Sequence, residues 1–271
     1  MNWRQVFLYT AVTAILLVRS DVALADPPLR VLLIGSPPDS HPKSTHEYLA
    51  GVRLLQKLLG QQKGIEPIVV QADSAWPDGP QLLDRGDGAV VFLTEGARWL
   101  SADPARRAAF ERLAERKGGL CCLHWGMGTK PPEPIPVFVN LFGACHGGPQ
   151  RKYKFLTTRL SFDADNPVAK GLESLECEEE YYYRLHQAQT GFQPLAYAEI
   201  DGQQELVGWT WSRPEGGRSF GFSGLHFHKN WEHESVRRMV LQGIVWTLNR
   251  PIPDEGFPVD IAPADLALPL P

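Results

Sequence analysis

The sequence lacks any stripe of basic residues. Its 27 lysines and arginines are interspersed with 31 aspartates and glutamates, and the formal net charge is −4. Proteins that bind nucleic acid gather cationic side chains on one face or along one helix, so a nucleic-acid partner is not expected. The chain is also poor in cysteine. Its four cysteines, of which Cys121 and Cys122 are adjacent, suggest no disulfide framework, and we expect free, buried thiols.

The N-terminal segment has no apolar run long enough for a stable membrane span. Residues 6–18 are mostly apolar, but the run is short and poorly flanked. A basic start at Arg4 and the small-x-small pattern of Ala23-Leu24-Ala25 are typical of a signal peptide. We therefore predict that residues 1–25 are a signal peptide and that the mature protein is exported, periplasmic or extracellular, with no membrane span. Retention of the segment as an N-terminal anchor is the alternative.

The remaining chain of about 245 residues is long enough for one α/β domain, which we place at residues 27–250. Amphipathic helices are predicted at 46–59, with Thr45 as N-cap, and at 103–117. Their alternation with strands favours right-handed crossovers and a parallel sheet. Nearly continuous apolar runs predict buried strands at residues 29–35, 65–70, 88–93 and 119–123.

The pattern changes after Trp125. The prolines of 131–136 predict a long loop without regular helix. Shorter strands then suggest an antiparallel extension of the same sheet, or a small lobe against it. The tail, residues 251–271, is proline-rich and is predicted to be extended or disordered. The later elements are expected at 154–158, 180–185, 194–200, 205–211 and 219–225 for strands and at 234–248 for a helix.

Several histidines follow the predicted strands. His124 ends the run 119–123, and His226 and His228 follow the apolar residues 219–223. If the last strand reaches that far, His226 and His228 face the same side, because side chains alternate with a period of two. Ligands of doubly wound sheets bind beyond the carboxyl ends of the strands, so we expect these imidazoles to meet there.

The turn after Leu123 resembles the nucleophile elbow of class I glutamine amidotransferase-like proteins. The position of the nucleophilic cysteine is taken by His124, and imidazole there removes thiolate chemistry. Cys122 lies two residues earlier, inside the predicted strand, where it should be buried and inert. A cysteine-dependent amidase or protease is therefore not expected.

Four segments, one of which contains this turn, together resemble the ThuA-like, or trehalose-utilisation, family. The resemblance covers most of residues 29–250. The resemblance implies a flavodoxin-like or class I glutamine amidotransferase-like three-layer sandwich, with a mostly parallel sheet and an antiparallel extension. The acidic motif of the family matches Glu179-Glu180-Tyr181-Tyr182, with Glu in place of the usual Asp. The segments are Thr45-His46-Glu47-Tyr48, residues 119–126, residues 178–185, and residues 224–231 leading to Trp246.

A carboxylate beside imidazoles can act as a general base, bind a metal, or fix a histidine tautomer. On a strand, Glu180 and Tyr182 share one face, and we favour Glu180 for the site. For Glu178 and Glu179, a solvated acidic edge remains the alternative. His146 is also left open, whereas His41 and His186 are expected at the surface and His233 near the start of the last helix.

The predicted catalytic residues are His124, Glu180 and His226. With His46 or His228 they are compatible with zinc or another divalent ion, and equally with a metal-free acid/base site. His46 and Glu47 are expected at a helix start, where backbone N–H groups bind anions or sugar hydroxyls. The alternative for Glu47 is that it only favours the helix N-terminus. The predicted substrate-binding residues are His46, Glu47, Trp125, Tyr182, His228, Asn230 and Trp231, with Trp209 and Trp211 as further stacking faces.

The family resemblance implies a role with trehalose-like disaccharides, or with keto-glycosides made by a partner dehydrogenase. We therefore expect an exported hydrolase, lyase or isomerase that acts on a small carbohydrate, as a monomer or a homo-oligomer. The alternative is a non-catalytic sugar-binding or scaffold module that has lost the amidotransferase nucleophile.

Overall fold

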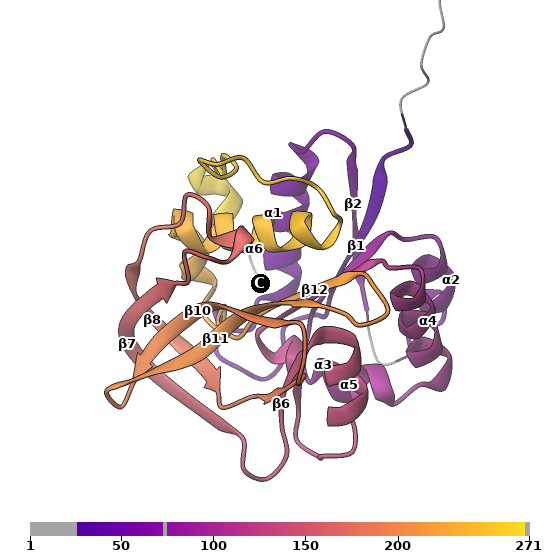
Figure 1. Ribbon diagram of the computed structural model, residues 1–271, viewed down its shortest axis with the longest axis horizontal. Coiled ribbons are helices and arrows are strands. Elements are labelled where there is room, and N and C mark those ends of the chain that lie inside the picture. The colour runs from indigo at the N-terminus through magenta and orange to yellow at the C-terminus, as the bar shows by residue number, and fades with distance from the viewer. Residues whose placement is uncertain (1–25, 73–74, 269–271) are drawn as a thin grey trace, which may run out of the picture.

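The computed structural model describes residues 26–72 and 75–268 (Figure 1). The predicted signal peptide lies outside the described residues, as do the last three residues of the predicted tail. Within the described ranges, no helix combines the length and apolarity that a membrane crossing requires.

The secondary structure alternates strands and helices in the first half and is rich in strands in the second. The strands are β1 (Leu29–Gly35), β2 (Ile65–Gln71), β3 (Gly88–Phe92), β4 (Gly119–Leu123), β5 (Gly128–Thr129), β6 (Ala144–Gly147), β7 (Lys152–Phe162), β8 (Leu175–Tyr183), β9 (His186–Gln187), β10 (Phe192–Ile200), β11 (Gln203–Ser212) and β12 (Arg218–Phe222). The α-helices are α1 (Tyr48–Gly60), α2 (Gly79–Asp84), α3 (Gly96–Ser101), α4 (Pro104–Glu115), α5 (Ile135–Phe142) and α6 (Glu234–Thr247). The 3-10 helices are η1 (His124–Met127), η2 (Pro167–Ala169), η3 (His228–Glu232) and η4 (Pro263–Leu266).

The core of the sheet is parallel, in the order β2-β1-β3-β4-β12. Every residue of β3 and β4 is buried, which explains why these strands are apolar throughout. Helices α1 and α6 lie on one face and α4 and α5 on the other, giving three layers (Figure 1). With β12 counted as the fifth strand, this is the flavodoxin-like order, which confirms the predicted fold class.

The antiparallel extension is built on β12. Strands β11, β10, β7 and β8 follow it in that order, each antiparallel to its neighbour. Strand β8 also packs close to β11 and to η3, so the extension curls back toward the end of β12. The prediction of an extension of the same sheet is confirmed, and the curl brings β8 to the carboxyl edge of the parallel core.

Several predicted boundaries are wrong. Helix α5 begins at Ile135 inside the proline-rich segment, because proline is tolerated in the first turn of a helix, where its missing N–H has no partner to lose. Thr45 is not an N-cap: it forms an isolated bridge with Phe227, and α1 begins at Tyr48. The last strand ends at Phe222, three residues earlier than predicted.

Candidate functional site

His124 stands directly after β4, in a strained and tightly packed turn. Its φ of 46° lies in the left-handed region, which is uncommon for a residue other than glycine. Gly126, two residues after His124, lies very close to β3. A Cβ atom at this position would be 2.3 Å from the carbonyl oxygen of Val91. The elbow-like turn predicted from the sequence is present, and His124 occupies it directly after β4.

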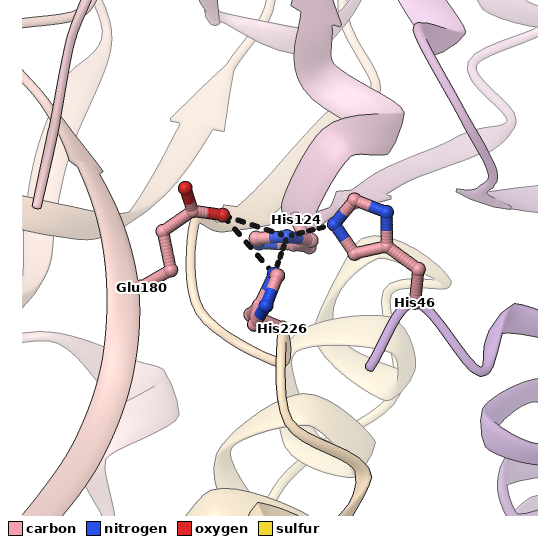
Figure 2. A group of neighbouring side chains, drawn as sticks. All are labelled: His46, His124, Glu180 and His226. Atoms are coloured by element: carbon pink, nitrogen blue, oxygen red, sulfur yellow. Dashed lines mark hydrogen bonds and ion pairs between the residues drawn. The ribbon is translucent and has the colours of Figure 1, made fainter. Parts of the chain in front are cut away.

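Four buried side chains from separate elements converge at this turn (Figure 2). The Nε2 atom of His124 is 3.1 Å from Nε2 of His46 and 3.3 Å from Nδ1 of His226. The Oε2 atom of Glu180 is 3.1 Å from Nδ1 of His226 and 3.6 Å from Nε2 of His124. All four ligand atoms lie within 4.8 Å of one another. We call these four residues the His–Glu cluster.

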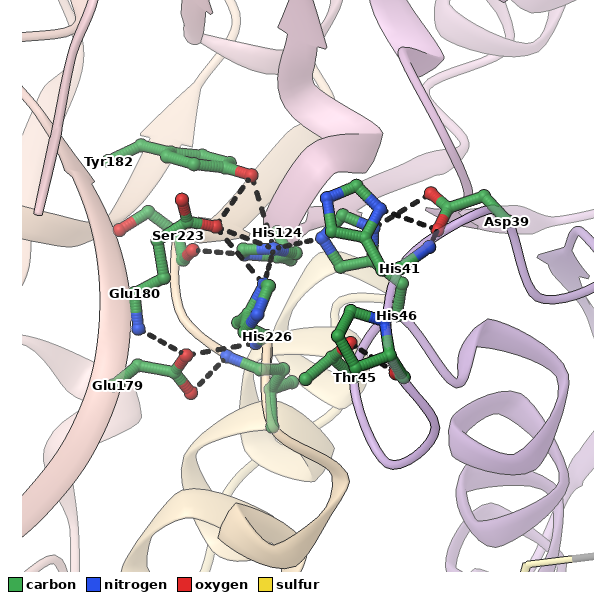
Figure 3. A network of polar contacts seen from close by, with 12 residues as sticks. Asp39, His41, Thr45, His46, His124, Glu179, Glu180, Tyr182, Ser223 and His226 are labelled. Atoms are coloured by element: carbon green, nitrogen blue, oxygen red, sulfur yellow. Dashed lines mark hydrogen bonds and ion pairs between the residues drawn. The ribbon is translucent and has the colours of Figure 1, made fainter. Parts of the chain in front are cut away.

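Hydrogen bonds on the outer side of the cluster fix two of its tautomers (Figure 3). The Nδ1 of His124 donates to the carbonyl oxygen of Ser223 at 2.9 Å. The Nδ1 of His46 lies 2.8 Å from a carboxylate oxygen of Asp39 and donates to it. A neutral imidazole carries one N–H, so in both rings the Nε2 lone pair points into the cluster.

Burial keeps these imidazoles neutral. It lowers the pKa of His124 well below its usual value, and it lowers the pKa of His46 to about 4 although the hydrogen bond and charge of Asp39 act in the opposite direction. Burial raises the pKa of Asp39, but hydrogen bonds from His46, His41 and Thr94 outweigh this and hold that pKa far below its usual range. At neutral pH, His46 and His124 therefore present the lone pairs of their Nε2 atoms to the centre of the cluster, and the carboxylate of Asp39 stays ionised outside it.

Glu179, which the sequence left open, positions the loop that carries His226. Its carboxylate accepts hydrogen bonds from the backbone N–H groups of Leu225 (2.7 Å) and His226 (2.9 Å), and from the side-chain amide of Asn230 (2.7 Å). Burial raises the pKa of Glu179 to about 7, although these hydrogen bonds lower it. The loop needs this anchor because Leu225 has a φ of 79°, an unusual conformation for a branched side chain.

The loops that carry His46 and His226 are also fastened to each other. Besides the bridge between Thr45 and Phe227, the N–H of His46 donates to the carbonyl of His226 at 3.0 Å. The N–H of His228 donates to the carbonyl of Ser44 at 2.8 Å. These contacts form a short ladder, which we call the loop clasp.

A cavity of about 280 Å³ opens onto the cluster, and His46 and Glu180 are part of its wall. The hydroxyl of Tyr182 lies 3.1 Å from Nε2 of His124 and 3.4 Å from the Glu180 carboxylate. The ring of Tyr182 is stacked between the imidazoles of His124 and His146, with centroids 4.7 and 4.1 Å away. The remaining lining residues are His41, Trp125, Lys130, His146, Arg151, Tyr153 and Phe155.

The aromatic side of this cavity comes from paired strands. Tyr153 of β7 is opposite Tyr182 of β8, and Phe155 is opposite Glu180, so all four side chains share one face. Tyr153 and Phe155 are each 53% exposed, unusual for large apolar groups in this chain. They form an accessible aromatic rim beside buried polar groups, an arrangement suited to a ring with polar edges.

The structure brings six of the predicted residues to one place and separates the others. His46, His124, Glu180 and His226 form the cluster, and Trp125 and Tyr182 line the cavity. Glu47 instead accepts a hydrogen bond from the N–H of Ser44, and Asn230 supports Glu179 from behind. Trp231 packs against Gly51 of α1, away from the cavity lining.

The predicted pairing of His226 and His228 on one strand face is wrong. Because β12 ends at Phe222, neither histidine lies on the strand, and His228 begins η3. His228 is buried outside the cluster and the cavity lining. Trp209 and Trp211 are core residues whose indole N–H groups donate to backbone carbonyls, so they offer no stacking face to a ligand.

Other site residues were not predicted. Asp39 belongs to no recognisable sequence motif, because it lies in a loop whose path the sequence does not specify. Ser223 contributes only a backbone carbonyl, which any residue could provide. His41 is at the surface, as expected, but its ring stands 3.8 Å from that of His46 at the cavity mouth. His146, left open by the sequence, is buried and lines the cavity.

Comparisons with known proteins agree with this fold. A ThuA-like protein from Bacteroides uniformis superposes with a TM-score of 0.62 at 16% identity, over 84% of this chain and 94% of that chain. A catalytic mutant of Gan42B, a GH42 β-galactosidase from G. stearothermophilus, gives a TM-score of 0.51 at 9% identity, over 83% of this chain and 31% of that chain. At these identities the likeness concerns the fold alone.

PurLQS from Thermotoga maritima is a looser match, with a TM-score of 0.45 at 14% identity over 82% of this chain and 98% of that chain, too distant to support an argument. No curated protein matches the sequence. The family model described as trehalose utilisation, ThuA, matches residues 39–247. That match spans most of the described residues and every member of the His–Glu cluster, and the chain belongs to the ThuA family.

Proposed function

We propose that this protein is an exported enzyme that acts on a small carbohydrate by metal-assisted chemistry at the His–Glu cluster. The observation that carries the proposal is the convergence of three imidazole nitrogens and one carboxylate oxygen on a single point beside an aromatic-rimmed cavity.

Without a cation, the inner side of the cluster is electrostatically unfavourable. The Nε2 atoms of His46 and His124 are 3.1 Å apart, and the outer hydrogen bonds to Asp39 and Ser223 leave a lone pair on each. The Glu180 carboxylate adds negative charge to the same point. The hydroxyl of Tyr182 can donate to Nε2 of His124, but the lone pair of His46 faces only that of His124. Buried polar groups normally have partners, and a cation between these atoms would bind both lone pairs and the carboxylate.

The distances suit a small divalent ion. Zinc bound tetrahedrally to nitrogen and oxygen at about 2.0–2.2 Å separates its ligand atoms by roughly 3.3–3.6 Å. Four of the six separations between the ligand atoms run from 3.1 to 3.6 Å, and all six are within 4.8 Å. An ion at the centre would therefore need only small shifts of the side chains.

The donor set selects the kind of metal. Imidazole-rich sites favour zinc and neighbouring transition metals, whereas magnesium and calcium prefer oxygen ligands. The hydrogen bonds from His46 to Asp39 and from His124 to Ser223 are the outer contacts that orient metal-binding histidines. A bound ion would polarise a sugar hydroxyl or carbonyl oxygen that reaches it from the cavity.

The residues of the cavity would bind and deprotonate the sugar. Tyr153, Phe155 and Trp125 provide stacking surfaces for a pyranose ring. Glu180, which belongs both to the cluster and to the cavity wall, is placed to accept a proton from the sugar, beside the hydroxyl of Tyr182. His124 donates its single N–H to Ser223 and would not act as the acid. The substrates that we infer from the family are trehalose-like disaccharides and keto-glycosides made by a partner dehydrogenase.

The test combines metal content with turnover. Purified full-length protein is stripped with a chelator, reloaded with zinc, manganese or magnesium, analysed for bound metal, and assayed on a panel of glycosides and their keto forms. We expect about one zinc per chain and turnover of at least one glycoside. His46→Ala and His226→Ala should lose both, whereas His233→Ala, outside the cluster, should lose neither.

The two readouts separate the possible failures. Wild-type protein that takes up no zinc, or variants that bind it as tightly as wild type, would exclude the metal. Loss of sugar binding in these variants, with no turnover by any form of the protein, would instead support the non-catalytic sugar-binding module.

A further inference from the structure

A second hollow continues from the cavity at the cluster. It has a volume of about 450 Å³ and lies between the loop after β6, the start of β7 and the turn after β8. His146 and Arg151 line both spaces, so a ligand can extend from one to the other along these two side chains. The other lining residues are Gly147, Pro149, Gln150, Lys152, Arg184 and His186.

The charge of this hollow is one-sided. Arg151, Lys152 and Arg184 bring three permanent cations, and none of its described lining residues is acidic. The lysines near the hollow have acidic partners: Lys130 pairs with Glu95 at 3.3 Å, and Lys154 pairs with Asp201.

Two of the three cations in the hollow have no such partner. Within the described parts of the chain, neither Arg151 nor Lys152 has a carboxylate within ion-pair distance, whereas Arg184 is paired with Glu205 at 3.0 Å. Positive charge therefore remains unbalanced directly beside the reaction cavity.

The two arginine side chains are also held in place. Arg151 donates to the carbonyl of Gly148 at 3.2 Å, and Arg184 reaches Glu205 from a backbone with a φ of 52°. His186, at the far wall, is 3.3 Å from the carbonyl of Gly147 through Nε2. Held guanidinium groups are suited to carboxylate, sulfate and phosphate, which they bind through paired N–H donors.

We propose that this basic hollow binds an anionic group on the sugar unit next to the reacting one, so that the preferred substrate is an acidic carbohydrate. This inference rests on the proposed function, because it takes the cavity at the cluster as the place of the reacting sugar. The anion is a carboxylate, sulfate or phosphate attached to a disaccharide or longer saccharide. Its role is recognition, and no bond is made or broken in the hollow.

The test is binding, measured by calorimetry on the full chain. The ligands are trehalose and three derivatives that carry a carboxylate, a sulfate or a phosphate at one 6-position. We expect at least one acidic derivative to bind about tenfold or more tightly than trehalose, with the gain falling as salt rises. Comparison of the three derivatives identifies which anion the hollow prefers.

The matched variants have equal charge. The double variant Arg151→Ala/Lys152→Ala should lose the preference for the acidic derivative, whereas Arg159→Ala/Lys154→Ala, which removes the same charge from β7 outside the hollow, should keep it. Equal binding of all four ligands, or a preference that survives in the first double variant, would overturn the proposal.

The metal-free protein separates this proposal from the previous one. An anion can also bind a metal ion directly, so the titrations are repeated after chelation. If the preference depends on the metal and not on Arg151 and Lys152, the basic hollow is not the anion site. Because calorimetry requires no turnover, an inactive protein that still prefers acidic saccharides would contradict the proposed reaction while supporting the hollow.

Discussion

At the scale of single residues, the cluster depends on partners that never face the cavity. Asp39 holds the N–H of His46, and the carbonyl of Ser223 holds that of His124. These outer contacts fix which nitrogen carries the lone pair, and a ring with the other tautomer would turn an N–H toward the ion. The affinity for the proposed metal ion would therefore be set partly by residues that are not ligands.

Asp39 offers a direct test of this dependence. In Asp39→Asn, the neutral amide should hold the His46 tautomer less firmly, and we expect zinc affinity to fall by about 10- to 100-fold. The measurement is a zinc titration against a competing chelator. Asp201→Asn, which changes an exposed carboxylate in the turn between β10 and β11, should bind zinc like wild type. Equal affinity in the two variants would show that Asp39 does not tune the site.

The sequence could identify His124, Glu180 and His226, because each stands beside a recognisable strand pattern or family motif. It could not identify Asp39 or Glu179 as supporting groups. Asp39 bonds to His46 within one loop, and Glu179 of β8 bonds to the N–H of His226, 47 residues away. These contacts follow from the packed structure. His228 shows the converse error, since a two-residue spacing has meaning only while the strand continues.

At the scale of secondary structure, the turn after β4 is the element that delivers His124. Gly126 lets this turn lie against β3, where a Cβ atom would clash with the carbonyl of Val91. The chain must move if any side chain is added there. The position of His124 is thus coupled to the spacing between a 3-10 turn and the neighbouring strand.

We expect Gly126→Ala to destabilise the protein by about 1–3 kcal/mol, the usual cost of overpacking a filled interior. Urea unfolding monitored by tryptophan fluorescence gives this value. Gly60→Ala is the matched control. Gly60 is the exposed last residue of α1 and its Cβ atom would meet only one atom, at 4.0 Å, so the stability of this variant should be unchanged or slightly higher. Similar unfolding midpoints for the two variants would contradict the argument.

The strands of the parallel core could be predicted closely, because full burial on both faces leaves continuous apolar runs. The short helices α2 and α3 were not predicted, and α5 was replaced by a loop. Six to eight residues give little periodicity, and proline at a first helical turn is easily interpreted as a break. The curl of the extension, which brings Glu180 to the cluster, depends on long-range packing.

At the scale of the whole molecule, the domain encloses all four of its cysteines. Burial raises the pKa of the Cys121 and Cys177 thiols to about 12 and that of Cys122 well above its usual value. A thiol reacts as the thiolate, so a pKa raised this far leaves almost no reactive form at neutral pH. All four cysteines are free thiols in the interior, and His124, not a cysteine, occupies the turn after β4.

We therefore expect iodoacetamide at pH 7.5 to label none of the four cysteines in the native protein and all of them in urea. Intact mass spectrometry counts the labelled sites at each condition. Labelling of Cys122 in the native state, faster than global unfolding, would indicate an accessible thiolate beside the elbow and would revive the amidotransferase interpretation.

The loop clasp has a consequence for how the site forms. Two of the four side chains of the His–Glu cluster, His46 and His226, are carried by segments 180 residues apart that share backbone hydrogen bonds. Because of these bonds, movement of one segment should displace the other. Conformations in which only one of the two imidazoles has left the cluster should therefore be rare. Capture and release of an ion would then be concerted, and the protein would switch between an empty and a complete centre with little in between.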